Sequence, residues 1–359
     1  MSDKLTGGGE FDFINRLRRR ENSHSTTATH SPLTTHHSSL LKGIGDDAAV
    51  FRQLSGFDTV VTADLLVEGV DFRLERGWAT PRDLGHKALA VSLSDVAAMG
   101  ARPRFCLLSV GVPAARWRRR FLEEVYEGVR ALARLHGVAI IGGDTSRTTA
   151  GVVVDSIVIG EARSGRALTR GGAHPGDQIF VTGTLGAAAA GLKVLESRAR
   201  ARLTKATRAL VRRQLRPTPR VEWGALLGEK RLATALIDLS DGLSSDLAHV
   251  CRESGVGARV EAELLPVEPL LKSAGLRSKS AGLSEGEALA LALDGGEDFE
   301  LLFTASPRAS SGLPREVGGV PVTRVGEVTG ERGKVRLVVG GRARLLRPGG
   351  FEHFRRDRN

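Results

Sequence analysis

The chain has 359 residues, 41% of them hydrophobic and 26% charged, a composition typical of a soluble globular protein. Its length exceeds what one hydrophobic core usually supports, so two domains are expected. No apolar run approaches a membrane span, no apolar secretory segment opens the chain, and two distant cysteines exclude a disulfide framework, so we expect a protein of the reducing cytoplasm without membrane contact.

The net charge of +11 raises the question of nucleic-acid binding. Basic residues cluster at 16–20, at 116–120 and near the end of the chain. No aromatic residues alternate with them to form a base-stacking surface. We therefore expect a solvated arginine-rich face and no nucleic-acid partner.

The first half alternates between strands and helices after a polar start. Residues 10–20 predict a short amphipathic helix, and residues 22–40, rich in Ser, Thr and His, predict a flexible loop whose histidines leave metal binding open as the less favoured alternative. Periodicity then predicts, in chain order, a strand at 59–67, a helix at 81–100, a strand at 104–113, a helix at 116–137, and strands at 138–146 and 151–162.

A turn-rich segment, 163–177, predicts a boundary between an N-terminal domain, 1–162, and a C-terminal domain, 163–359. The second half predicts a strand at 178–183, a helix at 185–195, a strand entering a turn at 231–242, a helix at 243–255, a loop leading into a strand at 290–305, and terminal strands at 321–330 and 334–346. The mixture indicates an α+β fold rather than a doubly wound sheet.

Acidic residues recur inside, or at the ends of, segments that otherwise read as core. They are Asp46, Asp47, Asp64, Asp95, Asp144, Asp238, Asp241, Glu297 and Asp298. Burying an unpaired carboxylate is costly. Taken singly, a backbone cap is the favoured explanation for Asp241 or Asp298, but the set together favours a shared cation. Its ligands are oxygens, with no Cys or His at metal spacing, which selects Mg²⁺, Mn²⁺ or Ca²⁺ rather than zinc.

Glycines beside these aspartates let the backbone approach a ligand closely. In "VTGTLGAAAAG", 181–191, a glycine turn precedes an alanine-rich helix whose N-terminal amides are candidates to meet an anion. The chain contains neither a Walker-type loop nor a Gly-x-Ser-x-Gly elbow. "GIGDDA", 43–48, fits Gly-x-Gly-x-x-Ala, but its two aspartates would repel a pyrophosphate.

Nine motifs occur in an order that resembles the thiamine-monophosphate kinase family of the aminoimidazole-ribonucleotide-synthetase-like superfamily. They are "GIGDDAAV", "TADLLVEGVDF", "KALAVSLSDVAAMGARP", "IIGGDTSR", "GRALTRGGAHPGD", "VTGTLGAAAAGL", "LRPTPR", "IDLSDGLSSDLAHV" and "GGEDFELLFT". The resemblance runs from about Glu10 to Phe354. Each motif alone is modest, whereas the ordered set is specific.

The resemblance implies a two-domain synthetase-like fold. Its N-terminal domain would bind Mg²⁺ and ATP and form a homodimer by pairing strands across a two-fold axis, and a C-terminal α+β domain would complete the active site. The implied reaction transfers the γ-phosphoryl group of ATP directly, in line, onto the phosphate of thiamine monophosphate, giving thiamine diphosphate. Several Mg²⁺ ions would bridge protein and phosphates.

The resemblance also implies residue roles by motif. The implied metal ligands are Asp47, Thr62, Ala63 through its carbonyl, Asp64, Asp95, Asp144, Asp238 and Asp241. The implied ATP contacts are Gly143, Asp144, Arg170 and Ser240. The implied contacts to thiamine monophosphate are Asp71, Glu297 and Phe351.

Two features depart from the family pattern. The loop 22–40 is longer and more polar than expected. Pro348 stands where some members offer an aromatic residue to the substrate ring, and Phe351 is the candidate to replace it. Asp46 is as consistent with capping as with metal ligation.

The chemistry needs no catalytic base. The acceptor phosphate has a second pKa near 6, so it is largely an anionic nucleophile at neutral pH. The task is to neutralise the repulsion between two phosphates and to align them, which calls for metal ions and a few cations such as Arg170.

Two alternatives stay open. The first is another ATP-using enzyme of the superfamily with a different phosphorylated substrate. A selenophosphate synthetase would need a reactive Cys or selenocysteine near the N-terminus, and none precedes Cys106. The second is a non-catalytic nucleotide- or nucleic-acid-binding protein.

Overall fold

The computed structural model describes residues 40–42, 49–52, 56–75, 78–117, 119–197, 203–273 and 283–351. The predicted helix 10–20, the loop 22–39, and Asp46 and Asp47 lie outside the described residues. Within these ranges no helix is both long and apolar enough to cross a membrane. The two cysteines are buried and unbridged, in agreement with the absence of a disulfide framework.

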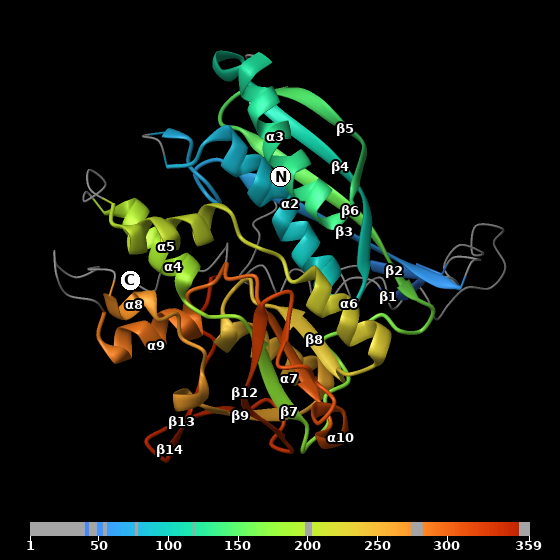
Figure 1. Ribbon diagram of the computed structural model, residues 1–359, viewed down its shortest axis with the longest axis vertical. Coiled ribbons are helices and arrows are strands. Elements are labelled where there is room, and N and C mark those ends of the chain that lie inside the picture. Colours follow the sequence, from blue (N-terminus) through green and yellow to red (C-terminus); the bar gives the residue numbers. More distant parts are fainter. Residues whose placement is uncertain are drawn as a thin grey trace, which may run out of the picture.

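The first half of the chain forms a six-stranded sheet. Its spatial order is β1 (Leu40–Lys42), β2 (Ala49–Arg52), β3 (Phe57–Val67), β6 (Val153–Arg163), β4 (Arg102–Pro113) and β5 (Ala139–Thr148). All neighbours are antiparallel except β4 and β5, which are parallel. Helices α2 (Pro81–Ala98) and α3 (Arg119–His136) pack against one of its faces (Figure 1).

The second half forms a mixed sheet with helices around it. Its strands run in the order β14 (Arg342–Leu345), β13 (Val335–Val339), β9 (Gly257–Glu261), β12 (Val320–Thr329), β7 (Gln178–Thr182), β10 (Leu301–Ala305) and β8 (Ala235–Asp238), with β11 (Glu316–Val317) paired to β12. The helices are α4 (Ala187–Glu196), α5 (Lys205–Leu215), α6 (Val221–Lys230), α7 (Leu243–Ser254), α8 (Leu270–Ser273), α9 (Glu285–Asp294) and α10 (Pro307–Ser310), with short 3₁₀ turns at Ala114–Arg116 and Ala262–Leu264. Two mixed sheets confirm the α+β prediction.

Among the described residues the element predictions hold except at α9 and at 334–346, where the predicted strand is divided by the glycines at 340 and 341 into the antiparallel strands β13 and β14. Residues 290–294 were predicted as part of a loop, but they form the second half of α9. The helix starts at a capping box in which Ser284 Oγ accepts from the backbone N–H of Glu287, whose carboxylate accepts from Ser284 N–H in return. This Ser-x-x-Glu signature was readable in the sequence. Helices α5 and α6 and strand β9 were not assigned at all.

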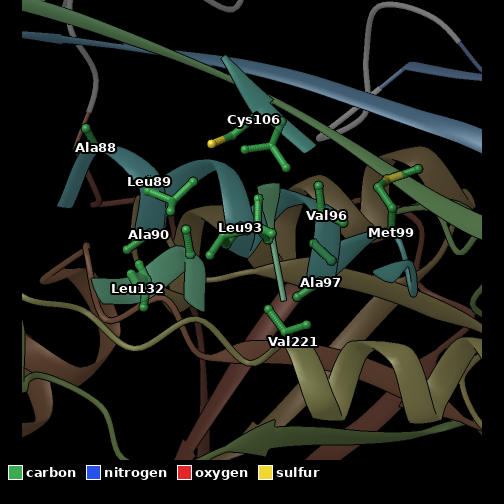
Figure 2. Packing of buried hydrophobic residues seen from close by; sticks show 14 of the residues in the cluster. Ala88, Leu89, Ala90, Leu93, Val96, Ala97, Met99, Cys106, Leu132 and Val221 are labelled. Carbon is green, nitrogen blue, oxygen red and sulfur yellow. The ribbon is translucent and has the colours of Figure 1, made fainter. Parts of the chain in front are cut away.

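Helix α2 is buried on almost every side. Thr80 caps its first turn through a capping box with Asp83, and Pro81 takes the first helical position. Figure 2 shows α2 side chains directed toward three neighbours, represented by Cys106 of β4, Leu132 of α3 and Val221 at the start of α6. The helix therefore lies between the first sheet and the second half of the chain.

Two neighbouring helices approach α2 closely enough to require glycine. A Cβ on Gly224 of α6 would lie 2.2 Å from the carbonyl oxygen of Ala97, and one on Gly128 of α3 would lie 2.1 Å from that of Arg82. These contacts fix the distance of α2 from α3 near its N-terminus and from α6 near its C-terminus.

We expect Gly224→Ala to destabilise the protein by about 1–3 kcal/mol, because its methyl group must push α6 away from α2. Gly286→Ala in α9 is the matched control, since its Cβ would meet nothing within 4 Å. That change should be neutral or stabilise by up to about 1 kcal/mol. Urea unfolding measures both, and equal effects at the two sites would contradict the close-approach argument.

Candidate functional site

Two of the three predicted metal ligands on β3 face α2. Strand alternation directs Thr62 and Asp64 to the face that α2 covers. There Thr62 Oγ1 donates a hydrogen bond to Asp95 Oδ2, and Ser92 Oγ donates to Asp64 Oδ2 at 2.7 Å. Ala63 lies between them with its exposed methyl group on the opposite face, so its side chain takes no part and a role for its carbonyl stays a prediction.

The same helix reaches the second sheet. Ser94 Oγ of α2 donates to Asp238 Oδ2 at the end of β8, at 2.6 Å, and both residues are buried. Ser92, Ser94 and Asp95 thus connect Asp64 of one sheet to Asp238 of the other within less than one helical turn. The structure brings these predicted ligands to the two sides of one helix.

A concentration of negative charge follows β8. Asp246 in the first turn of α7 is buried and accepts hydrogen bonds from the backbone N–H groups of Asp241 and Gly242, at 3.2 and 3.0 Å. Burial, together with repulsion from Asp241 and Asp238, raises the pKa of Asp246 well above its ordinary value, while Arg170 acts in the opposite direction. Asp246 therefore fixes the turn that leads into α7, and the capping explanation of Asp241 stays a prediction.

The donor chemistry of this region fits a hard divalent cation. Its potential ligand atoms are carboxylate and hydroxyl oxygens, which hard cations prefer. A bound cation would also relieve the mutual repulsion of Asp238, Asp241 and Asp246. Among the described residues, no three His, Cys, Asp or Glu side chains converge as they would on one ion. The predicted set includes Asp47, outside the described ranges, and Mg²⁺ usually also takes oxygens from water and substrate phosphates.

Gly143 and Asp144 lie apart from this group, on β5. Strand register aligns Asp64 with Ser156, Ser156 with Leu108, and Leu108 with Gly143, so three strand spacings, about 14 Å, separate Asp64 from Gly143. Gly143 has φ +145°, and a Cβ there would lie 2.0 Å from the carbonyl oxygen of Leu108. Asp144 is exposed, and its place in the metal and ATP sites stays a prediction.

The loop 295–300 folds back onto the turn after β8. Glu297 N–H donates to the Ser240 carbonyl at 2.7 Å, and Phe299 N–H donates to the Leu239 carbonyl at 3.0 Å. Glu297 and Phe299 both have left-handed backbones, with φ +57° and +50°, which non-glycine residues rarely adopt. A predicted substrate contact, Glu297, is therefore bonded to a predicted ATP contact, Ser240.

A buried ion cluster holds the end of this loop. Glu300 is fully buried and pairs with Arg220, which precedes α6, and with Arg213 of α5, at 2.8 Å in the second case. Thr182 Oγ1 of β7 also donates to Glu300, at 2.8 Å. These three partners offset the cost of burying the Glu300 charge. Because they hold the end of the loop, they help to maintain the unfavourable φ angles of Glu297 and Phe299.

Asp298 occupies the helix N-terminus that the sequence offered to an external anion. Its carboxylate accepts from the backbone N–H groups of Gly186 and Ala188, at 2.6 and 3.1 Å, at the start of α4. The expectation of an anion at these amides is corrected, because the anion is the protein's own side chain. The capping explanation of Asp298 is confirmed. Burial nevertheless raises its pKa to about 7.

A cavity of about 240 Å³ lies beside α2. Asp71 and Phe351, two of the three predicted substrate contacts, line it, and its other walls include Lys87 and Gln214. Asp71 Oδ2 accepts from Val67 N–H at 2.8 Å, which fixes the turn after β3. A larger cavity, about 570 Å³, shares Arg73 and Trp78 with the first.

The C-terminal segment delivers Phe351 to this cavity. Gly349 N–H donates to Ser244 Oγ and Gly350 N–H to Ser245 Oγ, each at 3.1 Å, and Phe351 N–H donates to the Asp241 carbonyl at 3.2 Å. The segment therefore lies along the N-terminus of α7. Its backbone hydrogen bond to Asp241 connects the predicted contact residue Phe351 to the acidic turn, which contains Asp238 and Asp241.

Several residues of the site were not found from the sequence. Lys87, Ser92 and Ser94 had a usable signal, since polar residues within an otherwise apolar helix need buried partners. Asp246 sits in the first turn of a predicted helix, the position of a cap. Gln214 had no local signal, because its partners are distant in the chain.

Comparisons with known proteins give a consistent relationship. A family model described as AIR synthase related protein, N-terminal domain, matches residues 45–162, and its C-terminal counterpart matches residues 174–338. A thiamine-monophosphate kinase from Bacillus subtilis (strain 168) is 38% identical over 350 residues, 96% of this chain and 99% of that protein.

Solved structures agree. AaThiL complexed with AMPPCP and TMP superimposes with a TM-score of 0.79 at 29% identity, covering 99% of this chain and 100% of that one. A thiamine-monophosphate kinase from Stenotrophomonas maltophilia K279a superimposes with a TM-score of 0.71 at 38% identity, covering 93% and 98%. Both similarities extend over both halves of the chain.

We expect Asp298 to make stability depend on pH. Its pKa is about 7 when folded and near 3.8 when unfolded, so the folded state binds more protons between these values and stability falls as pH rises toward 7. Between pH 5 and 8 this loss should be roughly 3 kcal/mol, and Asp298→Asn should remove it. Urea unfolding of both proteins at the two pH values measures the difference; parallel pH profiles would refute the assignment.

Proposed function

The chain belongs to the thiamine-monophosphate kinase family, and on this premise we propose that it transfers the γ-phosphoryl group of ATP to thiamine monophosphate, giving thiamine diphosphate and ADP. The observation that carries the proposal is the arrangement around α2. Carboxylate and hydroxyl oxygens from both sheets flank this helix, and a cavity with a carboxylate and an aromatic ring in its walls lies beside it.

The cavity suits the organic part of the acceptor. Thiamine carries a cationic thiazolium ring joined to an aminopyrimidine, so it needs apolar walls, negative charge and an aromatic surface. Leu192, Leu195 and Leu215 supply apolar walls, Asp71 a carboxylate and Phe351 an aromatic ring. We propose that Asp71, Glu297 and Phe351 contact thiamine, with Phe351 serving where Pro348 cannot.

The chain's own residues hold and align the phosphates. We propose that Gly143, Asp144, Arg170 and Ser240 contact ATP. The proposed Mg²⁺ ligands are Asp47, Thr62, Ala63 through its carbonyl, Asp64, Asp95, Asp144, Asp238 and Asp241. Bound Mg²⁺ would supply charge neutralisation between the two phosphates. Ser92, Thr62 and Ser94 orient the carboxylates of Asp64, Asp95 and Asp238 by hydrogen bonds.

No side chain needs to remove a proton from the acceptor. The phosphate of thiamine monophosphate is largely dianionic at neutral pH and attacks as it is. The residues around α2 therefore contribute position and charge rather than acid–base chemistry. The three oriented carboxylates, with the other proposed metal ligands, and Arg170 serve that role.

We further propose a homodimer in which the N-terminal domains pair strands across a two-fold axis and the second copy covers the open face of the six-stranded sheet. We also propose the domain boundary between residues 162 and 163. Two rows of apolar residues cross that face. Register aligns Ala63 with Ile157 and Leu107, and Val61 with Ile159 and Phe105, of which Phe105 is 40% exposed. A continuous apolar face of this kind is typical of a subunit interface.

The purified protein should convert thiamine monophosphate to thiamine diphosphate with ATP and Mg²⁺, and excess chelator should abolish the product. Asp95→Asn should lower turnover at least about 100-fold, because it removes a charge that holds the metal, yet leave unfolding nearly unchanged, since the amide oxygen still accepts from Thr62. Glu331→Gln, in an exposed pair with Arg336, is the control. Turnover only with another phosphorylated acceptor would overturn the substrate assignment.

Ile157→Glu should convert a dimer into a monomer, because it places two buried charges at the proposed interface. Light scattering coupled to gel filtration measures the mass. Val339→Glu, at an exposed position of β13, should leave the dimer intact. A monomeric unsubstituted protein, or an Ile157→Glu dimer, would exclude this interface.

A further inference from the structure

Glu297 is held on both carboxylate oxygens by residues of other elements. Its Oε1 lies 2.5 Å from the Lys87 ammonium of α2, and its Oε2 accepts from the side-chain Nε2 of Gln214 at the end of α5. Because a carboxylate only accepts hydrogen bonds, the Gln214 amide must turn its N–H₂ group toward Glu297. The orientation of the Gln214 amide is thereby fixed.

Lys87 anchors this arrangement. It is only 3% exposed, and it also donates from Nζ to the Asp71 carbonyl at 3.2 Å. A buried ammonium is tolerated only where charge and hydrogen bonds compensate it. One side chain therefore links the turn that carries Asp71 to the loop that carries Glu297.

The segment that follows Gln214 is docked on the same face of α2. Arg216 pairs with Asp83, and His86 Nε2 contacts the Pro217 carbonyl oxygen at 2.9 Å. Positions 83, 86 and 87 are spaced three and four residues apart, so they share one side of the helix. The positions of Gln214 and Glu297 are thus both fixed relative to helix α2.

The other end of the Gln214 amide has no partner. Gln214 is 5% exposed and lines the 240 Å³ cavity, and its Oε1 is buried without a hydrogen-bond partner among the residues that the structure describes. A buried acceptor that makes no hydrogen bond costs folding free energy, because it has lost its bonds to water. A ligand in this cavity that presents an N–H donor would satisfy it.

We propose that Gln214 determines acceptor specificity, its Oε1 accepting a hydrogen bond from the exocyclic amino group of the pyrimidine, with Lys87 and Glu297 as positioning residues that fix the amide. This inference rests on the proposed function, since it names a recognition contact within the proposed thiamine cavity. A pyrimidine with a carbonyl oxygen in place of the amino group would face Oε1 with a second acceptor and be repelled.

The experiment compares thiamine monophosphate with its oxythiamine analogue, in which that amino group is a carbonyl oxygen. The unsubstituted protein should prefer thiamine monophosphate at least about 10-fold in kcat/KM, because the wrong acceptor leaves Oε1 unpaired. Gln214→Leu should lose most of this preference and raise the KM for thiamine monophosphate, with the KM for ATP within about twofold. Gln178→Leu, on β7, is the matched control and should keep the preference.

A second variant tests the positioning role. Lys87→Met frees Glu297 and with it the amide, so it should also reduce the preference, and combining it with Gln214→Leu should add nothing further. Lys272→Met, in an exposed pair with Glu285, controls for loss of a lysine.

The outcomes separate the two claims. An unsubstituted protein that makes no thiamine diphosphate overturns the proposed function and this inference together. A protein that makes it but shows no preference, or a folded Gln214→Leu variant that keeps the preference, overturns this inference alone.

Discussion

The burial of α2 is the constraint on which the site depends. A helix enclosed by a sheet, by α3 and by α6 has no solvent for its polar side chains. Ser92, Ser94 and Asp95 must therefore find partners inside the protein, and they find them on β3 and β8. Because unsatisfied buried polar groups are costly, satisfying this helix also fixes where the carboxylates point.

Although the chain is strongly basic overall, its buried carboxylates differ in how well nearby cations neutralise them. The acidic turn after β8 concentrates Asp238, Asp241 and Asp246, and burial together with repulsion from Asp241 and Asp238 raises the pKa of Asp246. Nearby, Glu300 is fully compensated by Arg213 and Arg220. The protein thus neutralises the carboxylate that holds a loop and keeps mutual repulsion among the carboxylates that we propose as metal ligands and their neighbour Asp246. This division supports a site for metal-bound phosphates.

The substrate side is assembled from segments far apart in the sequence. The turn after β3, the end of α5 and the C-terminal segment meet at one cavity, and the loop 295–300 contacts its wall through the hydrogen bond between Gln214 and Glu297. The backbones of the loop 295–300 and of the C-terminal segment donate hydrogen bonds to the carbonyls of Ser240 and Asp241, in the turn after β8. Under the proposed function, recognition of the acceptor and the arrangement of the phosphate-facing residues would be coupled through these backbone hydrogen bonds.

The sequence by itself determined the α+β class, most elements and the chemical character of the site, because periodicity, glycine turns and core carboxylates are local signals. It also contained the ordered motifs of the family. The sequence-based prediction placed a loop at residues 290–294 of α9, although the Ser284 capping box was present. It also predicted an external anion at the N-terminal amides of α4, which Asp298 occupies. Only the tertiary structure decided that Asp298 fills that position, that Asp246 fixes the turn before α7 and that Lys87 and Gln214 hold Glu297. These contacts join residues up to 210 positions apart, and no local pattern specifies which distant polar group will satisfy a buried one.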